Sequence, residues 1–327
     1  MKNINDGSER ESGYSSLVTI CLLIFAAIAF WLLSGLSQAD AAPRIGDAAE
    51  SGSAPALQAQ YLALKGQLDA NAFQRPLVLE SRETSKTALG DVYAIVPHSF
   101  ENVRDALAGP QAWCEVLILH LNTKFCKIAR QAGGTTLLMN VGKKYDQPLA
   151  DSFRLSFAWE LVERTPAFLR IRLSADEGPL GTHDYRMALE AIPLENGQTF
   201  LHLSYSYGFG MTGKIAMMAY LNTLGRSKVG FTVTGNETGG QPIYIGGMRG
   251  LVERNTMRYH LAIESFLGAL ATPPRAQFEK RINDWFTAIE RYPRQLHEME
   301  QADYLEMKRK EYTRQQLGML PLEARPA

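Results

Sequence analysis

The chain has 327 residues, and its 34 lysines and arginines balance its 34 aspartates and glutamates to a formal net charge of zero. It contains no long basic stripe, which argues against nucleic acid as a partner, because neutralising phosphates requires clustered Lys and Arg side chains. The part that follows the N-terminal spacer approaches the upper size of one hydrophobic core, about 250–300 residues. One domain with a helical appendage is therefore expected.

An apolar stretch without charge runs from Leu17 to Leu36. It is longer than the core of a signal peptide, about 7–15 residues, and close to the roughly 20 residues that span a bilayer. Just downstream, Ala39-Asp40-Ala41 places small residues where signal peptidase cleaves. Residues 1–42 are thus either a cleaved signal peptide or a retained membrane anchor. In both cases we expect an exported protein, which in a bacterium is periplasmic or anchored in the inner membrane and facing the periplasm.

Residues 43–75 are predicted to form a linker and a short helix. Pro43 to Pro55 is rich in Ala, Gly and Ser, as in flexible tethers, and Ala56 to Ala72 has helical periodicity. The apolar face of this helix consists of Leu57, Tyr61, Leu64 and Leu68. Such a helix can pack on the body of the domain.

The next elements are two strands, two helices and two more strands. Aliphatic and β-branched residues predict strands at Leu77–Glu83 and Asp91–Val96. A helix begins at Pro97-His98-Ser99-Phe100 and ends at Gly109-Pro110, and a second short helix carries Trp113. Further strands are expected at about Thr123–Ala129 and Thr135–Val141.

The clearest alternation lies between Ser152 and Tyr207. In its first strand, Phe153, Leu155, Phe157, Trp159 and Leu161 share one face. The later strands repeat this pattern, and the last one sets His202, Ser204 and Ser206 on the polar face. This predicts an antiparallel sheet with one side facing water. The charged side chains of that side are interpreted as cross-strand ion pairs and not as an active site: Arg154, Glu160, Arg170, Arg172, Asp184, Arg186 and Glu190.

An insertion, residues 211–247, separates the sheet from a long helix. It is expected to hold a helix and a hairpin around Asn236-Glu237-Thr238-Gly239. The long helix, about Met248 to Leu270, is expected to bury one stripe on the sheet: Leu251, Asn255, Tyr259, Ala262, Phe266 and Leu270. Its charged residues Glu253, Arg254, Arg258 and Glu264 are expected to point mostly elsewhere.

A C-terminal helical extension covers residues 273–327. Its apolar residues recur at alternating four- and three-residue steps, as in a coiled-coil seam: Phe278, Ile282, Trp285, Ile289, Tyr292, Leu296 and Met299. Because Pro293 interrupts the seam, docking onto the domain is favoured over an intermolecular coil. The basic run Lys308-Arg309-Lys310 is interpreted as a solvated helix face.

The order of these elements resembles the START-like superfamily, also called the helix-grip or birch-pollen-allergen-like fold, which includes polyketide cyclase and lipid-transfer relatives. The segment from Val92 to Val103, followed by Trp113, is similar to the family's passage from strand to helix. The resemblance implies an α+β fold over residues 76–272, in which a curved antiparallel sheet wraps around the long helix. It also implies an internal hydrophobic cavity and a lipid-like or other hydrophobic small molecule as the partner.

Seven inward-facing residues are candidates for lining that cavity: Trp159, Tyr185, Met187, Tyr205, Tyr207, Asn255 and Tyr259. Buried tyrosine hydroxyls require hydrogen-bond partners, and a ligand head group can supply them. Core packing is the competing interpretation. Binding, sequestration or transfer of a hydrophobic molecule is the expected function. The alternatives are a cyclase or hydrolase using an acid–base pair in the cavity, or an assembly protein acting through its C-terminal helices.

The remaining motifs are weak. Gly208-Phe209-Gly210-Met211-Thr212-Gly213-Lys214 matches the glycine spacing of a dinucleotide loop, but its strand alternates like its antiparallel neighbours and no acidic residue follows at the required distance. The six histidines are scattered, so no metal, cofactor or catalytic residue is predicted. Cys114 and Cys126 either form a disulfide in an oxidising compartment or are two small buried apolar side chains.

Overall fold

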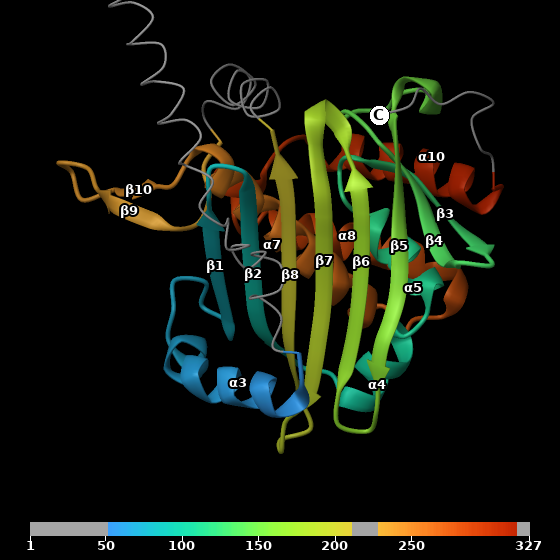
Figure 1. Cartoon of the computed structure of the whole chain (residues 1–327). Coiled ribbons are helices and arrows are strands. Elements are labelled where there is room, and N and C mark those ends of the chain that lie inside the picture. Colours follow the sequence, from blue (N-terminus) through green and yellow to red (C-terminus); the bar gives the residue numbers. More distant parts are fainter. Residues whose placement is uncertain (1–51, 211–227, 319–327) are drawn as a thin grey trace, which may run out of the picture. The chain divides into compact units, whose positions relative to one another are not determined.

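The computed structural model of the chain describes residues 52–210 and 228–318. Its main feature is an eight-stranded antiparallel sheet with the strand order β1-β2-β8-β7-β6-β5-β4-β3 (Figure 1). The strands are β1 (Leu77–Glu83), β2 (Thr87–Val96), β3 (Thr123–Gln131), β4 (Gly134–Val141), β5 (Phe153–Arg164), β6 (Leu169–Glu177), β7 (Thr182–Pro193) and β8 (Thr199–Phe209). Short 3-10 turns, η1 (Leu149–Asp151) and η2 (Pro179–Gly181), precede β5 and β7. The predicted strands are present, and all their pairings are antiparallel.

Two short helices, α4 (Phe100–Leu107) and α5 (Pro110–Leu117), carry the chain from β2 to β3 at the far edge of the sheet. The Ser99 side chain accepts a hydrogen bond from the Asn102 amide and so caps α4, while Pro110 begins α5 at a position where no backbone donor is needed. Trp113 of α5 is fully buried and donates to the Leu107 carbonyl. The sequence predicted both helices.

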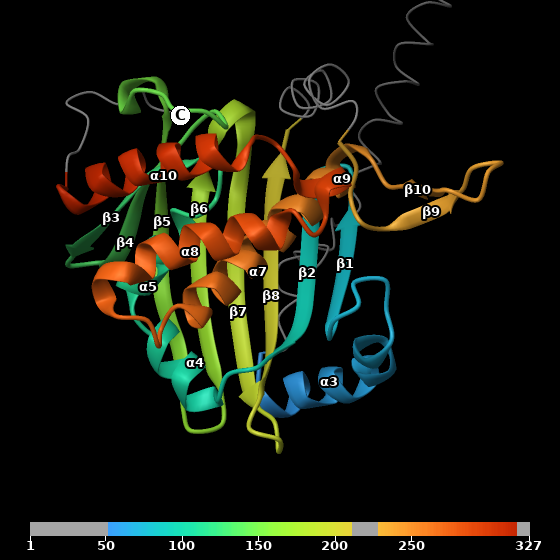
Figure 2. The same ribbon diagram turned by 180° about the vertical axis from the view of Figure 1, so that it is seen from behind.

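The long helix α7 (Gly247–Gly268) lies against one face of the sheet, as the helix-grip resemblance implied (Figure 2). It approaches β2 so closely that a Cβ atom at Gly90 would collide with Thr256. A glycine in the middle of a strand is therefore explained by helix packing. Together, the antiparallel sheet and the helix that it grips establish the predicted α+β helix-grip fold.

The C-terminal helices α8 (Pro274–Ile289), α9 (Pro293–Leu296) and α10 (Gln301–Gln316) pack on the same side as α7 (Figure 2). Ile282, Trp285 and Leu296 belong to the core cluster that also contains the inner sheet residues. Docking of the predicted seam onto the domain is therefore confirmed. One detail of the prediction was wrong: Lys308 is completely buried, because its ammonium group reaches Glu311 and two backbone carbonyls, whereas Lys310 is exposed.

Helix α3 (Ala54–Asp69) packs on the opposite face of the sheet, near one end of the strands (Figure 1). Leu57, Leu64 and Leu68 form a second core there with sheet residues that include Tyr93 and Phe200. The prediction of one uniformly wet face was thus wrong for this region, where His202, Ser204 and Ser206 are also buried. It holds on β5, where Arg154, Ser156 and Glu160 are exposed.

Helix α7 is buried on more sides than its sequence indicated. Glu253, Arg254 and Arg258 were expected to point mostly away from the protein, yet all three are buried. Arg258 is covered by α8 and α9, and its side chain donates to the Leu296 carbonyl. The chain that precedes β9 covers the other two, because Arg254 donates to the Val229 carbonyl. Glu253 accepts hydrogen bonds from the Phe231 and Thr232 amides, and it thereby fixes the chain that leads into α7.

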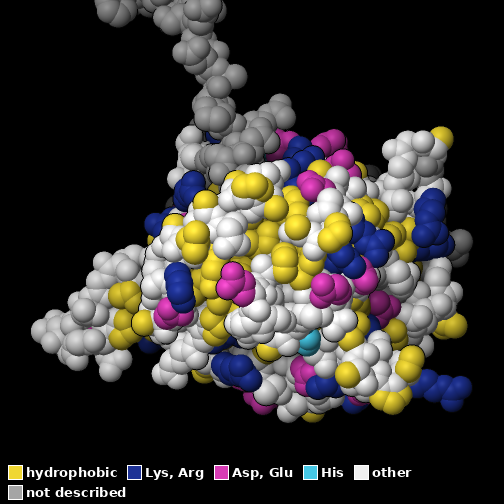
Figure 3. Space-filling view, turned by 90° about the horizontal axis from the view of Figure 1, so that it is seen from below, with side chains coloured by type: hydrophobic (Ala, Val, Ile, Leu, Met, Phe, Trp, Pro, Cys, Tyr) yellow, Lys and Arg dark blue, Asp and Glu magenta, His cyan; other side chains and the backbone are white. Residues whose placement is uncertain are grey.

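The insertion ends in the expected hairpin, β9 (Val233–Asn236) and β10 (Pro242–Tyr244). The helix expected after Met211 and the apolar stretch Leu17–Leu36 lie outside the described residues. Within 52–210 and 228–318, no helix has both the length and the apolar character required to cross a bilayer. The end of the molecule seen in Figure 3 has apolar side chains near its centre and charges of both signs scattered around them.

Candidate functional site

All seven predicted cavity residues lie on the inner face of the sheet or on α7. Trp159, Met187 and Tyr205 stand in one row across the strands, with Leu173 between Trp159 and Met187. They face the same side because residues two apart on a strand, and partners in register on neighbouring strands, share a face. Tyr185 and Tyr207 follow one step further along β7 and β8, and Tyr259 reaches this group from α7.

The tyrosines form a continuous chain of ring contacts. The ring centroids of Tyr185 and Tyr207 are 5.6 Å apart, those of Tyr205 and Tyr207 are 5.8 Å apart, and Tyr259 meets Tyr205 edge-on at 5.2 Å. Burial raises the pKa of all four phenols. They are therefore protonated at neutral pH and can act as hydrogen-bonding groups, not as bases.

The α7 stripe that was expected to be buried is so only in part: Ala262 and Phe266 are buried, but its N-terminal half keeps accessible surface. Leu251, Asn255 and Tyr259 are half-buried, whereas their helical neighbours Val252, Thr256 and His260 are almost completely buried. Tyr259 nevertheless touches Tyr205, which is itself buried beneath the helix. The Tyr259 ring therefore reaches the inner side of the sheet while part of its own surface stays accessible.

Sequence reasoning missed one residue of this region, His120, in the short connection between α5 and β3. Its ring stacks on Tyr259 with centroids 4.8 Å apart, and the Asn255 side chain lies beside it. Burial, followed by the charges of Arg258, Lys308 and Lys144, holds the pKa of His120 well below its usual value. The imidazole is therefore neutral. No periodic pattern in a short connection indicates which way a side chain will point, so no signal in the sequence could have identified it.

Three polar atoms of this inner region have no hydrogen-bond partner among the described residues. They are the Trp159 Nε1, the Tyr207 hydroxyl and the His120 Nε2. The Tyr185 hydroxyl, by contrast, lies 2.7 Å from the Thr182 hydroxyl. Buried polar groups are normally paired by protein, water or a ligand. The arrangement is therefore an apolar, aromatic surface with a few polar atoms that can meet a partner from outside the chain.

Sequence reasoning also missed a buried ionic triad on the opposite face of the sheet. His202 Nε2 lies 2.9 Å from Asp91 and its Nδ1 lies 3.1 Å from Glu190, and all three side chains are buried. Burial alone would lower the pKa of His202, but the hydrogen bonds to the two carboxylates outweigh it and raise the pKa. With both ring nitrogens donating, this imidazolium has no lone pair with which to act as a base.

The triad connects the sheet to the beginning of the described chain. Glu190 accepts a hydrogen bond of 3.0 Å from the Gly52 amide, and the Arg170 guanidinium lies 3.5 Å from the same carboxylate. Arg170 and Glu190 are register partners, as are Arg172 and Glu160, which are 3.4 Å apart. These are the cross-strand pairs expected from the charged face. The triad itself could be found only once β8 was known to lie between β2 and β7.

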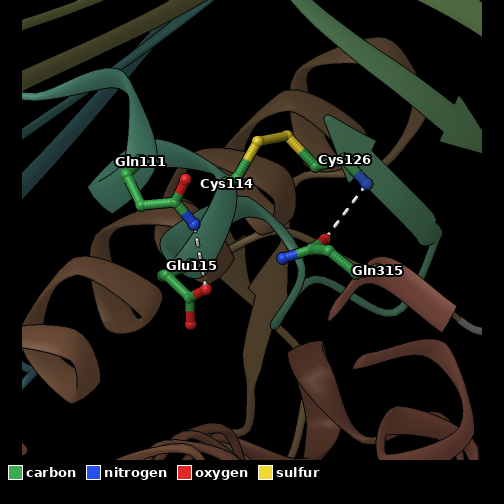
Figure 4. The surroundings of a disulfide bond; sticks show 5 residues. All are labelled: Gln111, Cys114, Glu115, Cys126 and Gln315. Atoms are coloured by element: carbon green, nitrogen blue, oxygen red, sulfur yellow. Dashed lines mark hydrogen bonds between the residues drawn. A yellow bond between two sulfur atoms is a disulfide. The ribbon is translucent and has the colours of Figure 1, made fainter. Parts of the chain in front are cut away.

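Cys114 of α5 and Cys126 of β3 form a disulfide (Figure 4). Next to it, the Gln315 side chain of α10 accepts a hydrogen bond of 3.1 Å from the Cys126 amide. Gln111 and Glu115 lie on the α5 side of the bond. The disulfide thus joins a helix to the next strand at the place where α10 crosses them.

The other motifs noted in the sequence form no binding site among the described residues. The Gly208 pattern begins on β8, which pairs antiparallel with both neighbours and so lacks the parallel strand of a dinucleotide fold. Met211 to Lys214 lie outside the described residues. Within the part of the chain that is described, no three His, Cys, Asp or Glu side chains are placed to hold a metal ion.

No protein-family model matches the chain, and no curated protein does. Similar solved structures include norcoclaurine synthase from Thalictrum flavum (16% identity, 45% of this chain, 90% of that chain, TM-score 0.31). A protein from Thermus thermophilus matches with 13% identity over 60% of this chain and 100% of its own, with a TM-score of 0.35. Human StAR-related lipid transfer protein 5 matches with 12% identity over 52% of this chain and 87% of its own, with a TM-score of 0.28. At such values the helix-grip assignment rests on the strand order and helix packing of this chain itself.

Proposed function

We propose that the chain binds a hydrophobic small molecule between the inner face of the sheet and α7, and that it sequesters or transfers this molecule outside the cytoplasm. The observation that carries the proposal is the half-buried Tyr259, which touches buried Tyr205 and His120 and still keeps accessible surface. A helix packed solidly on a sheet would leave no such surface at this point. The Tyr259 ring contacts the aromatic rings of Tyr205 and His120.

The chemistry of this surface fits binding through apolar contact with a few orienting polar groups. Removing apolar surface from water contributes roughly 25 cal/mol per Å², so a lipid-sized molecule can bind tightly without charged contacts. The tyrosine hydroxyls and Trp159 Nε1 can fix its orientation. Catalysis would need an acid–base pair titrating near neutral pH. The raised pKa values of the tyrosines and the lowered pKa of His120 favour binding over catalysis.

Two features support a location outside the cytoplasm. Leu17–Leu36 has the composition of an export signal or an anchor, and the Cys114–Cys126 disulfide is of a kind that persists in oxidising compartments. In a bacterium this means the periplasm, with the protein either free or attached to the inner membrane by its uncleaved segment. A protein tethered in this way would take up and release its ligand beside a membrane.

The C-terminal helices are a poor basis for an assembly function. The apolar residues of the α8 seam, including Ile282 and Trp285, belong to the chain's own core. Tyr304 of α10 donates to the Leu119 carbonyl in the interior. Little of this seam therefore remains for a partner protein.

The proposal is tested by filling the inner surface. Met187 stands in register between Leu173 and Tyr205, so Met187→Trp places an indole where the ligand would lie. Native mass spectrometry of the full chain, followed by organic extraction, should show a bound hydrophobic molecule in the wild type. The Met187→Trp variant should lose at least about nine-tenths of it, an effect of about 1.4 kcal/mol or more.

The matched control is Ser156→Trp, which adds the same indole to the exposed face of β5 and should retain the ligand. If space is present, Met187→Trp should leave the unfolding midpoint nearly unchanged. In a solid core the same change would destabilise by about 1–3 kcal/mol through overpacking. An empty wild type together with such a destabilised variant would refute the proposed function.

A further inference from the structure

Hydrogen-bond donors dominate the unpaired polar atoms of the inner surface. The Nδ1 of His120 lies 3.2 Å from the Asn122 amide and accepts its hydrogen, so the proton of the neutral ring is on Nε2. No hydrogen bond of normal geometry reaches this Nε2–H from the described residues, although the Asn255 side chain lies beside the ring and raises its pKa, and His120 is almost completely buried. The Trp159 Nε1 is likewise a donor. A ligand group that satisfies them must accept hydrogen bonds.

The surroundings of His120 are rich in cations. Lys124 and Lys308 are both completely buried and share one carboxylate, Glu311, at 2.9 and 2.7 Å. The Lys308 ammonium also donates to the carbonyl of His120 itself. In this cluster, two ammonium groups therefore face a single compensating charge.

A second cluster repeats this imbalance. Glu298 pairs with Lys144 at 2.7 Å, with Lys228 at 3.3 Å and also with Arg258 at 2.8 Å. Arg258 and Lys144 are among the charges that hold His120 neutral, which places this cluster near the ring as well. Among the residues that the structure describes, each cluster sets two lysines against one carboxylate, so the region around His120 favours negative charge.

We propose that the molecule bound at the inner surface is an amphiphile with an anionic head, a carboxylate or a phosphate, and that this head docks at His120 and Asn255 beside Tyr259. This inference rests on the proposed function and specifies its ligand class. An anionic oxygen would accept from the His120 Nε2 and from the Asn255 amide, in a region where the nearby clusters favour its charge. The hydrocarbon part would then extend over Tyr205, Met187 and Trp159.

A neutral or cationic head group fits the surroundings of His120 less well. A cation would be repelled by the lysine and arginine groups around His120, and it could not accept the imidazole hydrogen. An alcohol could accept that hydrogen but would gain nothing from the surrounding positive charge. Charge-assisted hydrogen bonds are roughly twice as strong as neutral ones, so the difference between an anion and an alcohol should be measurable.

The test compares four compounds that share a twelve-carbon chain and differ in their head group. Isothermal titration calorimetry of the full chain in amphipol would measure the binding of dodecanoate, dodecyl phosphate, dodecanol and dodecyltrimethylammonium. At least one anion should bind about tenfold or more tightly than dodecanol, because a hydrogen bond to a charged group contributes roughly 1.5–3 kcal/mol. The ammonium compound should bind most weakly. The ratio of the two anions tells whether a carboxylate or a phosphate is preferred.

Two substitutions separate the role of Nε2 from that of the ring. His120→Asn keeps an acceptor near the Nδ1 position and removes the Nε2 donor, whereas His120→Gln keeps a donor near Nε2. His120→Asn should reduce the advantage of the anion about tenfold with dodecanol binding unchanged, and His120→Gln should reduce it less. His98→Asn, on the β2–α4 connection, is the control and should behave as the wild type. Asn255→Leu is a second route to the same loss if His120→Asn does not fold.

The outcomes separate the two proposals. If the anions and dodecanol bind equally, or if His120→Asn weakens all ligands alike, the head-group assignment is wrong and the proposed function stands. If none of the four compounds binds the wild type, the proposed function itself fails.

Discussion

Buried ionisable groups hold separate segments of this chain to its sheet. On the outer face, the Asp91–His202–Glu190 triad reaches the Gly52 amide. On the inner side, Lys124 of β3 pairs with Glu311 of α10, and Lys308 of α10 donates to the His120 carbonyl in the α5–β3 connection. Groups of this kind are destabilising when one partner is removed, because the remaining charge stays buried without compensation. Single residues far apart in the sequence thus control whether distant elements remain docked.

The Lys308–Glu311 pair gives a prediction with a defined pH dependence. Burial lowers the pKa of Lys308 to about 8, against the attraction of Glu311. Since the unfolded chain binds this proton more tightly, the free energy of unfolding should rise with pH between about 8 and the usual lysine pKa of about 10.4. Lys308→Met should make this rise in the free energy of unfolding smaller. Part of the rise should remain in the variant, because the pKa of Lys144 is also lowered to about 8. Denaturant unfolding at about pH 7.5 and 9.5, on either side of the lowered pKa, measures the difference.

Glu311→Gln tests the same cluster by removing the carboxylate that pairs with both lysines. It leaves two buried ammonium groups without their carboxylate and should lower the free energy of unfolding by about 3–5 kcal/mol at neutral pH. Lys310→Met, on the exposed side of the same helix, should change it by less than about 0.5 kcal/mol. An equal effect of the two substitutions would contradict the buried cluster.

At the scale of elements, periodicity identified the strands and the long helix correctly but did not identify what covers each face. The alternation of β8 predicted one wet side, whereas α3 packs over part of that side and buries Phe200. Likewise, Arg258 was expected outside because α8 could not be placed against α7 from the sequence. Burial of a polar face depends on the docking of another element, and local spacing does not encode it.

At the candidate site, too, the sequence predicted some features and not others. Trp159, Met187 and Tyr205 were predictable because a strand's alternation fixes the face of each residue. Their alignment in one row depends on the register between neighbouring strands, which the sequence does not state. Asn255 and Tyr259 followed from helical periodicity. His120 followed from neither, because it lies in a connection.

The disulfide makes a prediction for α5 and β3. Cys114 and Cys126 are 12 residues apart, and closing a loop of this size in the unfolded chain corresponds to about 3 kcal/mol. Cys114→Ala/Cys126→Ala should lower the free energy of unfolding by about this amount. The wild type treated with a reductant should approach the double variant. A wild type that does not respond to reduction would show that the bond contributes nothing.

The same bond tests the proposed location. Alkylation of intact cells before lysis should leave Cys114 and Cys126 unmodified until a reductant is added, because the oxidised pair cannot react. Ready alkylation of both thiols in the untreated cells would place the domain in a reducing compartment. Cys21, which lies outside the described residues, must be replaced by Ala in this experiment so that its thiol is not counted.

On the scale of the whole molecule, one core connects the sheet with the long helix and the C-terminal extension. Trp285 of α8 is completely buried, donates to the Arg258 carbonyl of α7 and stacks on Tyr304 of α10 with centroids 5.0 Å apart. The sheet residues Leu189 and Leu203 belong to the same cluster. The extension should therefore unfold together with the domain and not as a separate appendage.

Trp285→Ala tests whether the C-terminal extension and the domain unfold together. Truncation of a buried tryptophan should lower the free energy of unfolding by about 3–5 kcal/mol. Because α7, α8 and α10 meet at this residue, the variant should still unfold in one transition, with the same midpoint by far-UV and near-UV circular dichroism. Leu317→Ala, at a 66% exposed position after α10, is the control and should shift neither midpoint. If instead the helical signal were lost at low denaturant while the sheet persisted, α8–α10 would form an independent unit, and an assembly role for these helices would regain support.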